Sequence, residues 1–413
     1  MNQCVTKGRV AALLAFAFLC SSCERAFADE LPAKTQNSFW RTGVIVAAGN
    51  IENESILCIL DTGASATVLH KDYQQVLPAT AKGKEEDILT LSATERRVAY
   101  ENIEVSIGSY GQQKSRAFVF DLSNVQEVTG LQVGAIVGAD YLRNLAFVMQ
   151  DGMPRFTNSP IAHRTEVQTW PISGSEIQIP EIPLEYPVLG LRNAGFDTGL
   201  SEHLAISQEF ADLLLRSGDA RFLTKTKHLD ASGVQTKSVI AIRELKVMGI
   251  QFRNVPAEVG KLNHVGMGLL RNINFTVDFK KSVAYLSGDA QDGRDTFPVD
   301  ASGIRFVWDD RGYYRIRRIE DGSPAAEADL KPDDELVAIS EIQASTLSWW
   351  QIREMLAVAG TMVEMTVKRN GNLMDVKLPL LRNFQYPPAW SSRSTEAGDF
   401  LDALQTDSAN DAK

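Results

Sequence analysis

The sequence predicts a mainly β protein, in which two lobes of similar construction are followed by a smaller α+β domain. Three observations favour this fold class. A tripeptide recurs with matching flanks in both halves of the chain, short β-branched runs such as Ile103–Ile107 and Val239–Ile242 occur in both halves, and the composition changes after a polar, acidic stretch at 287–300. The length of 413 residues suits about three domains.

The first 28 residues are typical of a signal peptide. Lys7 and Arg9 precede an apolar run at 10–20, and Ala26-Phe27-Ala28 has the small-x-small form of a cleavage site. The run is too short to cross about 30 Å of hydrocarbon as a helix. We therefore expect cleavage after Ala28 and a periplasmic or secreted protein. A lipid anchor at Cys23 is the less favoured alternative, because the position three residues earlier holds a cysteine instead of an aliphatic residue.

The repeated tripeptide is Asp61-Thr62-Gly63 in the first lobe and Asp197-Thr198-Gly199 in the second. Each copy follows an apolar run, and a serine, Ser65 or Ser201, stands two positions after it. One copy alone would be an ordinary polar turn, since Asp, Thr and Gly all form turns. Two copies with the same flanks indicate a duplication.

Two such motifs suit the attack of water on an amide, which needs a base for the water and an acid for the carbonyl oxygen. Carboxylates within about 3 Å of each other share one proton, because like charges that close cannot both ionise. The glycines allow a substrate backbone to approach closely, and the threonine hydroxyls can hydrogen-bond across to the other loop. Each motif therefore supplies half of a hydrolytic site, with Asp61 and Asp197 as the catalytic pair.

These residues resemble the retropepsin-like aspartic peptidases, whose lobes carry a hydrophobic-hydrophobic-Asp-Thr-Gly-Ala-Ser stretch and a later element of two apolar residues and a glycine. The later elements here are Ile136-Val137-Gly138 and Val265-Gly266, and both continue into Leu-Arg-Asn. His264 takes the place of the first apolar residue in the second lobe. The resemblance implies two β-barrel lobes, at 29–160 and 161–295, that form a bilobal acid-protease fold.

The same resemblance implies an aspartic endopeptidase that hydrolyses protein or peptide substrates without a metal or cofactor. Beside the catalytic pair it assigns support of the active-site loops to Thr62, Gly63, Ser65, Thr198, Gly199 and Ser201, and inner-loop roles to Gly138 and Gly266. A hairpin flap in each lobe would lie near 89–94 and 229–233, although the first could equally be a plain surface hairpin. A connection rich in Pro, Ser, Thr and Gly, at 157–183, would join the lobes.

Ala64 and Leu200 follow the two glycines, where strongly acid-active pepsin-like relatives have a hydroxyl residue that hydrogen-bonds the ionised carboxylate. Without those donors the pair is expected to hold its shared proton to higher pH. We therefore expect a bell-shaped activity profile on the mildly acidic to near-neutral side.

Residues 296–382 resemble a PDZ domain of the bacterial secreted type. The resemblance rests on Gly322-Ser323-Pro324-Ala325-Ala326 and the following Leu336-Val337-Ala338-Ile339. It implies a groove that binds a peptide as an added strand, between a strand at Tyr314–Ile319 and a helix from about Ser348 to Val358.

Three details concern that domain. Ser348 and Gln351 have the form of a capping box. Asp329 and Asp333 stand where the family prefers glycine, and aspartate tolerates a left-handed backbone better than most residues. The acidic pair at 309–310 disfavours capture of a peptide's C-terminal carboxylate.

The remaining features mainly exclude other functions. A net charge of −10 leaves no electrostatic footprint for nucleic acid, and the five histidines lack the spacing of metal ligands. Removal of the signal peptide would leave Cys58 as the one cysteine, expected in the core. Residues 383–413 are predicted to be a disordered tail.

The main alternative function is a non-catalytic peptide-binding or adaptor protein that keeps the peptidase fold and the PDZ groove.

Overall fold

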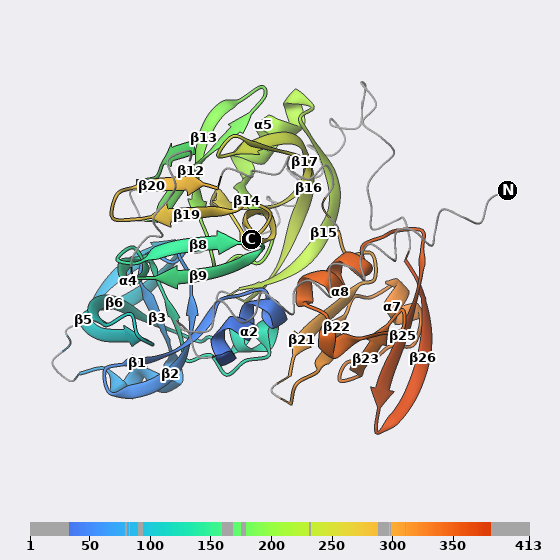
Figure 1. The fold of residues 1–413 in the computed structure, drawn as a ribbon. Coiled ribbons are helices and arrows are strands. Elements are labelled where there is room, and N and C mark those ends of the chain that lie inside the picture. Colours follow the sequence, from blue (N-terminus) through green and yellow to red (C-terminus); the bar gives the residue numbers. More distant parts are fainter. Residues whose placement is uncertain are drawn as a thin grey trace, which may run out of the picture.

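The computed structural model describes residues 33–78, 81, 83–89, 94–158, 168–174, 179–230, 233–287, 297, 299–309 and 311–380. The predicted signal peptide with Cys23, the predicted tail at 383–413 and both predicted flap tips lie outside these residues. The predicted domain boundaries near 160 and 295 also fall outside them. The chain is mainly β, as predicted, and Figure 1 shows its sheets.

A seven-stranded sheet forms the first lobe, in the order β1-β2-β7-β3-β6-β5-β4, and a further pairing of β1 with β5 bends it toward closure. Its strands are β1 (Val46–Ile51), β2 (Glu54–Leu60), β3 (Thr67–His70), β4 (Gly83–Leu89), β5 (Thr94–Ile107), β6 (Gln112–Phe120) and β7 (Ala135–Val137). The helices of this part are α2 (Ala33–Thr42), η2 (Lys71–Val76), α3 (Ser123–Thr129) and α4 (Ala139–Leu142).

An eight-stranded sheet forms the second lobe and repeats the topology of the first, in the order β11-β12-β13-β18-β14-β17-β16-β15. Its strands are β11 (Ser173–Gly174), β12 (Pro180–Tyr186), β13 (Gly190–Phe196), β14 (Leu204–Ser207), β15 (Ala220–Asp230), β16 (Gly233–Val247), β17 (Ile250–Gly260) and β18 (His264–Val265). The helices are α5 (Gln208–Ser217) and α6 (Met267–Leu270). The parallel pair β13–β18 corresponds to β2–β7, and β12–β16 corresponds to β1–β5. The duplication seen in the sequence is therefore a duplication of topology.

A five-stranded sheet, in the order β10-β20-β19-β8-β9, joins the two lobes. It contains β8 (Ala146–Gln150), β9 (Met153–Thr157), β10 (Gln168–Pro171), β19 (Phe275–Asp278) and β20 (Val283–Leu286). Phe147 on β8 packs with Phe196 and Phe275, at ring-centroid distances of 5.0 and 5.7 Å. The predicted connection at 157–183 is thus partly sheet, because β10 gains a partner in β20.

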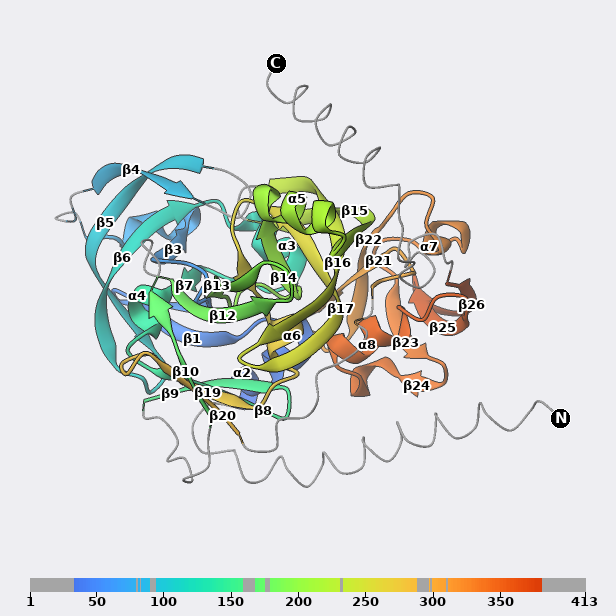
Figure 2. The same cartoon turned by 90° about the horizontal axis from the view of Figure 1, so that it is seen from above.

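The C-terminal domain is a six-stranded sheet with short helices, and it lies to one side of both lobes in Figures 1 and 2. Its elements are β21 (Ile304–Trp308), β22 (Tyr314–Ile319), α7 (Pro324–Glu327), β23 (Glu335–Ile339), β24 (Ile342–Gln343), η3 (Ala344–Thr346), α8 (Trp349–Met355), β25 (Met362–Arg369) and β26 (Asn372–Pro379). Asp329 and Asp333 have left-handed backbones, with φ of 57° and 73°, as expected. The capping box of Ser348 and Gln351 is present, but α8 ends at Met355, short of the predicted Val358.

The predicted location of a peptide groove beside β22 is wrong. β22 pairs with β21 along its length and with β23 at Tyr314 and Arg315, so β21 and not β22 is the strand that faces α8. The edge strand is β21, and a small cavity of about 140 Å³ separates it from α8. The second lobe closes that cavity, because Glu202, His203 and Glu258 line its other side.

Contacts of α8 tie the C-terminal domain to the rest of the chain. Trp350 is buried against Phe39 of α2, with ring centroids 6.0 Å apart, and the Arg271 guanidinium lies 4.4 Å from the Trp350 ring centroid. Arg41 of α2 donates hydrogen bonds to backbone carbonyls of Ser345 and Leu347. Trp350 therefore serves the docking of the C-terminal domain as well as its core.

Candidate active site

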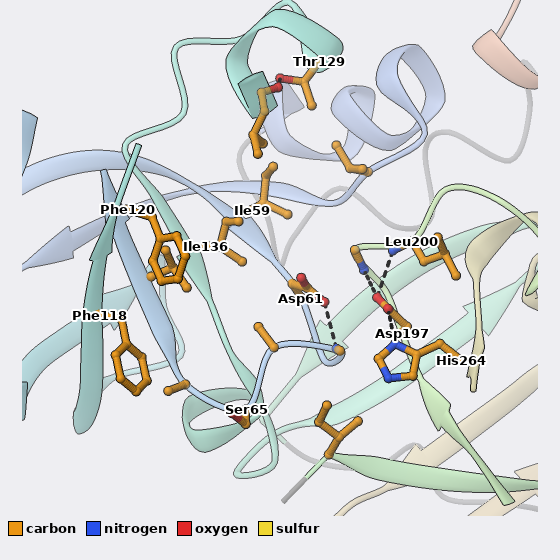
Figure 3. A pocket seen from close by; sticks show the side chains of 18 of the residues that line it. Ile59, Asp61, Ser65, Phe118, Phe120, Thr129, Ile136, Asp197, Leu200 and His264 are labelled. Atoms are coloured by element: carbon orange, nitrogen blue, oxygen red, sulfur yellow. Dashed lines mark hydrogen bonds and ion pairs between the residues drawn. The ribbon is translucent and has the colours of Figure 1, made fainter. Parts of the chain in front are cut away.

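The two Asp-Thr-Gly loops meet between the lobes, where they leave β2 and β13. In Figure 3 the side chains of Asp61 and Asp197 approach each other across this junction. The threonines lock the loops together: the Thr62 amide donates to the Thr198 hydroxyl at 3.0 Å, and the Thr198 amide donates to the Thr62 hydroxyl at 3.1 Å. The Thr198 hydroxyl in turn donates to the carbonyl of Leu60 at 2.8 Å. The cross-loop hydrogen bonds expected from the sequence are therefore present.

The glycines of the motifs make room for the carboxyl group of the opposite lobe. A Cβ atom at Gly63 would lie 2.3 Å from Cγ of Asp197, and one at Gly199 would lie 2.3 Å from Cγ of Asp61. Real Cβ atoms do not approach other atoms this closely. From the sequence we expected these glycines to allow close approach of a substrate backbone. In the structure they allow close approach of the two carboxyl groups.

The inner-loop glycines support the aspartate loops from below. The amides of Asp61 and Asp197 each donate at 3.0 Å to a carbonyl of the inner loop, that of Val137 or Val265. A Cβ atom at Gly138 would lie 2.5 Å from the carbonyl oxygen of Ala66, and one at Gly266 would lie 2.2 Å from that of Glu202. Both positions therefore require glycine because backbone from the aspartate loop packs directly against them.

The two carboxyl groups have opposite electrostatic environments. Burial, and then the charge of Asp197, raise the pKa of Asp61 well above its usual value. Burial also acts to raise the pKa of Asp197, but the hydrogen bond and charge of His264, together with the Leu200 amide, outweigh it and lower that pKa. In a pair that shares one proton, these opposite directions favour the proton on Asp61 and the charge on Asp197.

His264 is a residue of the candidate site that was not predicted from the sequence. Its Nδ1 lies 2.7 Å from Oδ2 of Asp197, and both side chains are 5% exposed. The signal in the sequence was a polar residue at an apolar position of the second inner loop. As expected from Ala64 and Leu200, no hydroxyl follows either glycine, but Asp197 has other donors, because the imidazole at 2.7 Å and the Leu200 amide at 2.8 Å lie within hydrogen-bonding distance of it.

The carboxyl pair lies in a cleft with a cavity volume of about 810 Å³. Apolar side chains of the first lobe line one part of it, and Figure 3 labels Ile59, Phe118, Phe120 and Ile136 there. The β4–β5 hairpin contributes 86–88, and the C-terminal domain contributes Arg305, Phe306, Arg317, Arg318 and Trp349. Ser65 and Ser201 line the cleft, while the hydrogen bonds to the two carboxylates come from loop amides and His264.

Three further observations bear on the site. Within the described residues, no group of three or more His, Cys, Asp and Glu side chains is arranged to hold a metal ion. None of the helices in the described part of the chain is long and apolar enough to cross a bilayer. Cys58 is fully buried in β2, as predicted.

In comparisons with known proteins, no family model and no curated protein matches this chain.

Proposed function

We propose that this protein is an aspartic endopeptidase built from two retropepsin-like lobes with a PDZ-like C-terminal domain. One observation carries the proposal: two carboxyl groups, from loops held together by reciprocal threonine hydrogen bonds, lie in one cleft between duplicated lobes. The pKa of one is raised and that of the other is lowered. Amide hydrolysis requires an acid and a base at one carbonyl group, and this pair provides both.

The ionised Asp197 takes a proton from water as the water oxygen attacks the peptide carbonyl carbon. Asp61 gives its proton to the carbonyl oxygen, and a neutral tetrahedral diol forms. The C–N bond then breaks, Asp197 returns its proton to the amine nitrogen, and a diol hydroxyl returns a proton to Asp61. The products are a carboxylic acid and an amine, and the pair regains its starting state.

The cleft supports a polypeptide substrate. It runs from the carboxyl pair along the apolar side chains of the first lobe and under the β4–β5 hairpin, which occupies the place of a flap. The second hairpin, β15–β16, instead lines the small cavity against β21 and α8 through Thr224, Lys225 and Thr226. We therefore assign a flap role to the first hairpin only.

Export to the periplasm or the medium, with cleavage after Ala28, remains part of the proposal. The adaptor alternative is less supported than hydrolysis, because the second lobe closes the cavity between β21 and α8 where a PDZ-like domain would receive a peptide. Both aspartates are in place, and a decayed site would have been free to lose either.

The test is hydrolysis of a mixture of unstructured peptides between pH 3 and 9, with products identified by mass spectrometry. The wild-type protein should cleave internal peptide bonds, and Asp61→Asn and Asp197→Asn should each reduce cleavage at least a thousandfold while remaining folded. Asp219→Asn is the matched control, since Asp219 is buried in the second lobe but lies outside the cleft. A wild-type protein that cleaves nothing while binding peptides would favour the adaptor function.

A further inference from the structure

The two lobes differ at a pair of facing strand positions, one located two residues before the aspartate and the other two residues before the inner-loop glycine. In the first lobe, Ile59 on β2 pairs with Ile136 on β7. At the equivalent positions of the second lobe, Gly195 on β13 pairs with His264 on β18. Both members of an apolar pair have thus been replaced, one by the smallest residue and one by an imidazole.

The glycine is what makes room for the imidazole. A Cβ atom at Gly195 would lie 2.7 Å from Cδ2 and 2.9 Å from Nε2 of His264. A buried polar ring costs free energy unless it is hydrogen-bonded, and the apolar pair of the first lobe would fill the same space without that cost. The exchange therefore points to a role for the imidazole beyond packing, and its polar contact is Asp197.

We propose that His264 is a positioning residue that holds Asp197 in its ionised form and so places the single proton of the pair on Asp61. This inference rests on the proposed function. It gives each carboxylate a fixed role, base for Asp197 and acid for Asp61, in a site whose backbone is otherwise nearly symmetric between the lobes.

The charges around the imidazole agree with this role. Asp197 contacts it directly, Asp61 lines the same cleft, and Glu202 and His203 follow on the segment that leads into β14. Glu202 is neutralised by an ion pair with Arg353. The charged residue of β13, Arg192, is exposed, and β14 carries none. Asp197 is thus the anion that His264 contacts directly.

The other oxygen of Asp197 is already occupied. Oδ1 accepts the amides of Gly199 and Leu200 at 2.9 and 2.8 Å, so the imidazole bonds to the oxygen that remains, Oδ2. Because a carboxylate can only accept, Nδ1 carries the proton of this bond. Loss of the donor should leave Asp197 easier to protonate, and the acidic limb of the activity profile should then move to higher pH.

The first test compares pH profiles of kcat/KM for the wild type, His264→Ile and His264→Asn. Isoleucine reproduces the residue of the first lobe and removes the donor, whereas asparagine keeps an N–H donor near the place of Nδ1. The acidic limb should move upward by on the order of one to two pH units in His264→Ile and by less in His264→Asn. The basic limb should move less. Superimposable acidic limbs in all three proteins would overturn the inference.

The second test does not depend on hydrolysis. Phenyl glycidyl ether alkylates an ionised carboxylate: the carboxylate oxygen opens the epoxide to an ester, and the ring oxygen takes a proton from water. Peptide mapping of the wild type at pH 5 should find the ester on Asp197. Gly195→Ala, which displaces the ring without deleting it, and His264→Ile should both shift label toward Asp61. Equal labelling of the two aspartates in the wild type would contradict the inference, whether or not the protein cleaves peptides.

Discussion

Arg353→Met would remove one side of a partly buried ion pair between the C-terminal domain and the segment that follows the second Asp-Thr-Gly motif. Arg353 on α8 contacts both carboxylate oxygens of Glu202, at 3.1 and 2.9 Å, and Glu202 follows directly after Ser201. The Glu202 carbonyl accepts the amide of Gly268 beside the inner loop. The ion pair therefore joins α8 to the frame that holds Asp197.

The expected loss of folding free energy can be worked out from the pKa of Glu202. Burial acts to raise the pKa of Glu202, but Arg353, with smaller contributions from Arg305 and His203, outweighs it and lowers that pKa from 4.5 to about 2. The Glu202 side chain is only 16% exposed, so screening by solvent is limited. The shift corresponds to about 3 kcal/mol of folding free energy, which is similar to the cost of breaking other buried ion pairs.

The pH dependence has a definite sign. A carboxylate whose pKa is lowered on folding stabilises the protein above its unfolded pKa, and that stabilisation disappears as the pH falls toward the folded value. The free energy of unfolding of Arg353→Met should therefore lie about 3 kcal/mol below the wild type at pH 7, and the difference should shrink between pH 4.5 and 2.

The free energy of unfolding can be measured by urea unfolding followed by tryptophan fluorescence, because Trp349 stacks on Arg353. Glu364→Gln is the control, since it breaks an exposed ion pair with Lys377 in the same domain and should cost under about 0.5 kcal/mol. Equal losses in the two variants, or a loss for Arg353→Met that is the same at pH 7 and pH 3, would refute the reasoning.

Three more predictions concern the site and its strands. Thr198→Val leaves the Thr62 amide without its acceptor and should cost about 2–3 kcal/mol in urea unfolding and more than tenfold in kcat, whereas Thr62→Ser, which keeps the hydroxyl, should cost much less in both measurements. Gly199→Ala should abolish hydrolysis at every pH because the new Cβ meets the opposite carboxyl group, while Gly174→Ala, with open space around it, should be fully active. Burial raises the pKa of Cys58 to about 12, so iodoacetamide at pH 8 should label it in urea but not in the folded protein.

Local sequence contained the duplicated motifs, and these were enough to predict the paired aspartates and the threonine hydrogen bonds. Each motif carries its own chemistry within three residues, so no knowledge of distant contacts was needed. The role of His264 depends on the β13–β18 register, which places it opposite Gly195 from 69 residues away. Spacing along the chain does not reveal such a contact.

The incorrect predictions of the fold also concern features that depend on contacts between distant parts of the chain. The sequence does not predict β10 as a strand, because strand formation there depends on its partner β20. The groove was assigned to β22 because the sequence does not show which strand of the β21–β22 hairpin lies at the sheet edge. The ion pair of Glu202 with Arg353 could not be predicted either, because the two residues lie 151 positions apart in the sequence.

Mixing the two inactive variants tests the central claim most directly, namely that one chain supplies both carboxylates of a hydrolytic pair. Peptide cleavage in ¹⁸O-labelled water would be measured for the wild type, for Asp61→Asn, for Asp197→Asn and for an equimolar mixture of the two variants. We expect the wild type to place one ¹⁸O atom in each new carboxyl group, and the variants and their mixture to release no product. Recovery of cleavage in the mixture, or full cleavage by Asp197→Asn alone, would contradict the account, because the pair would then form between two chains.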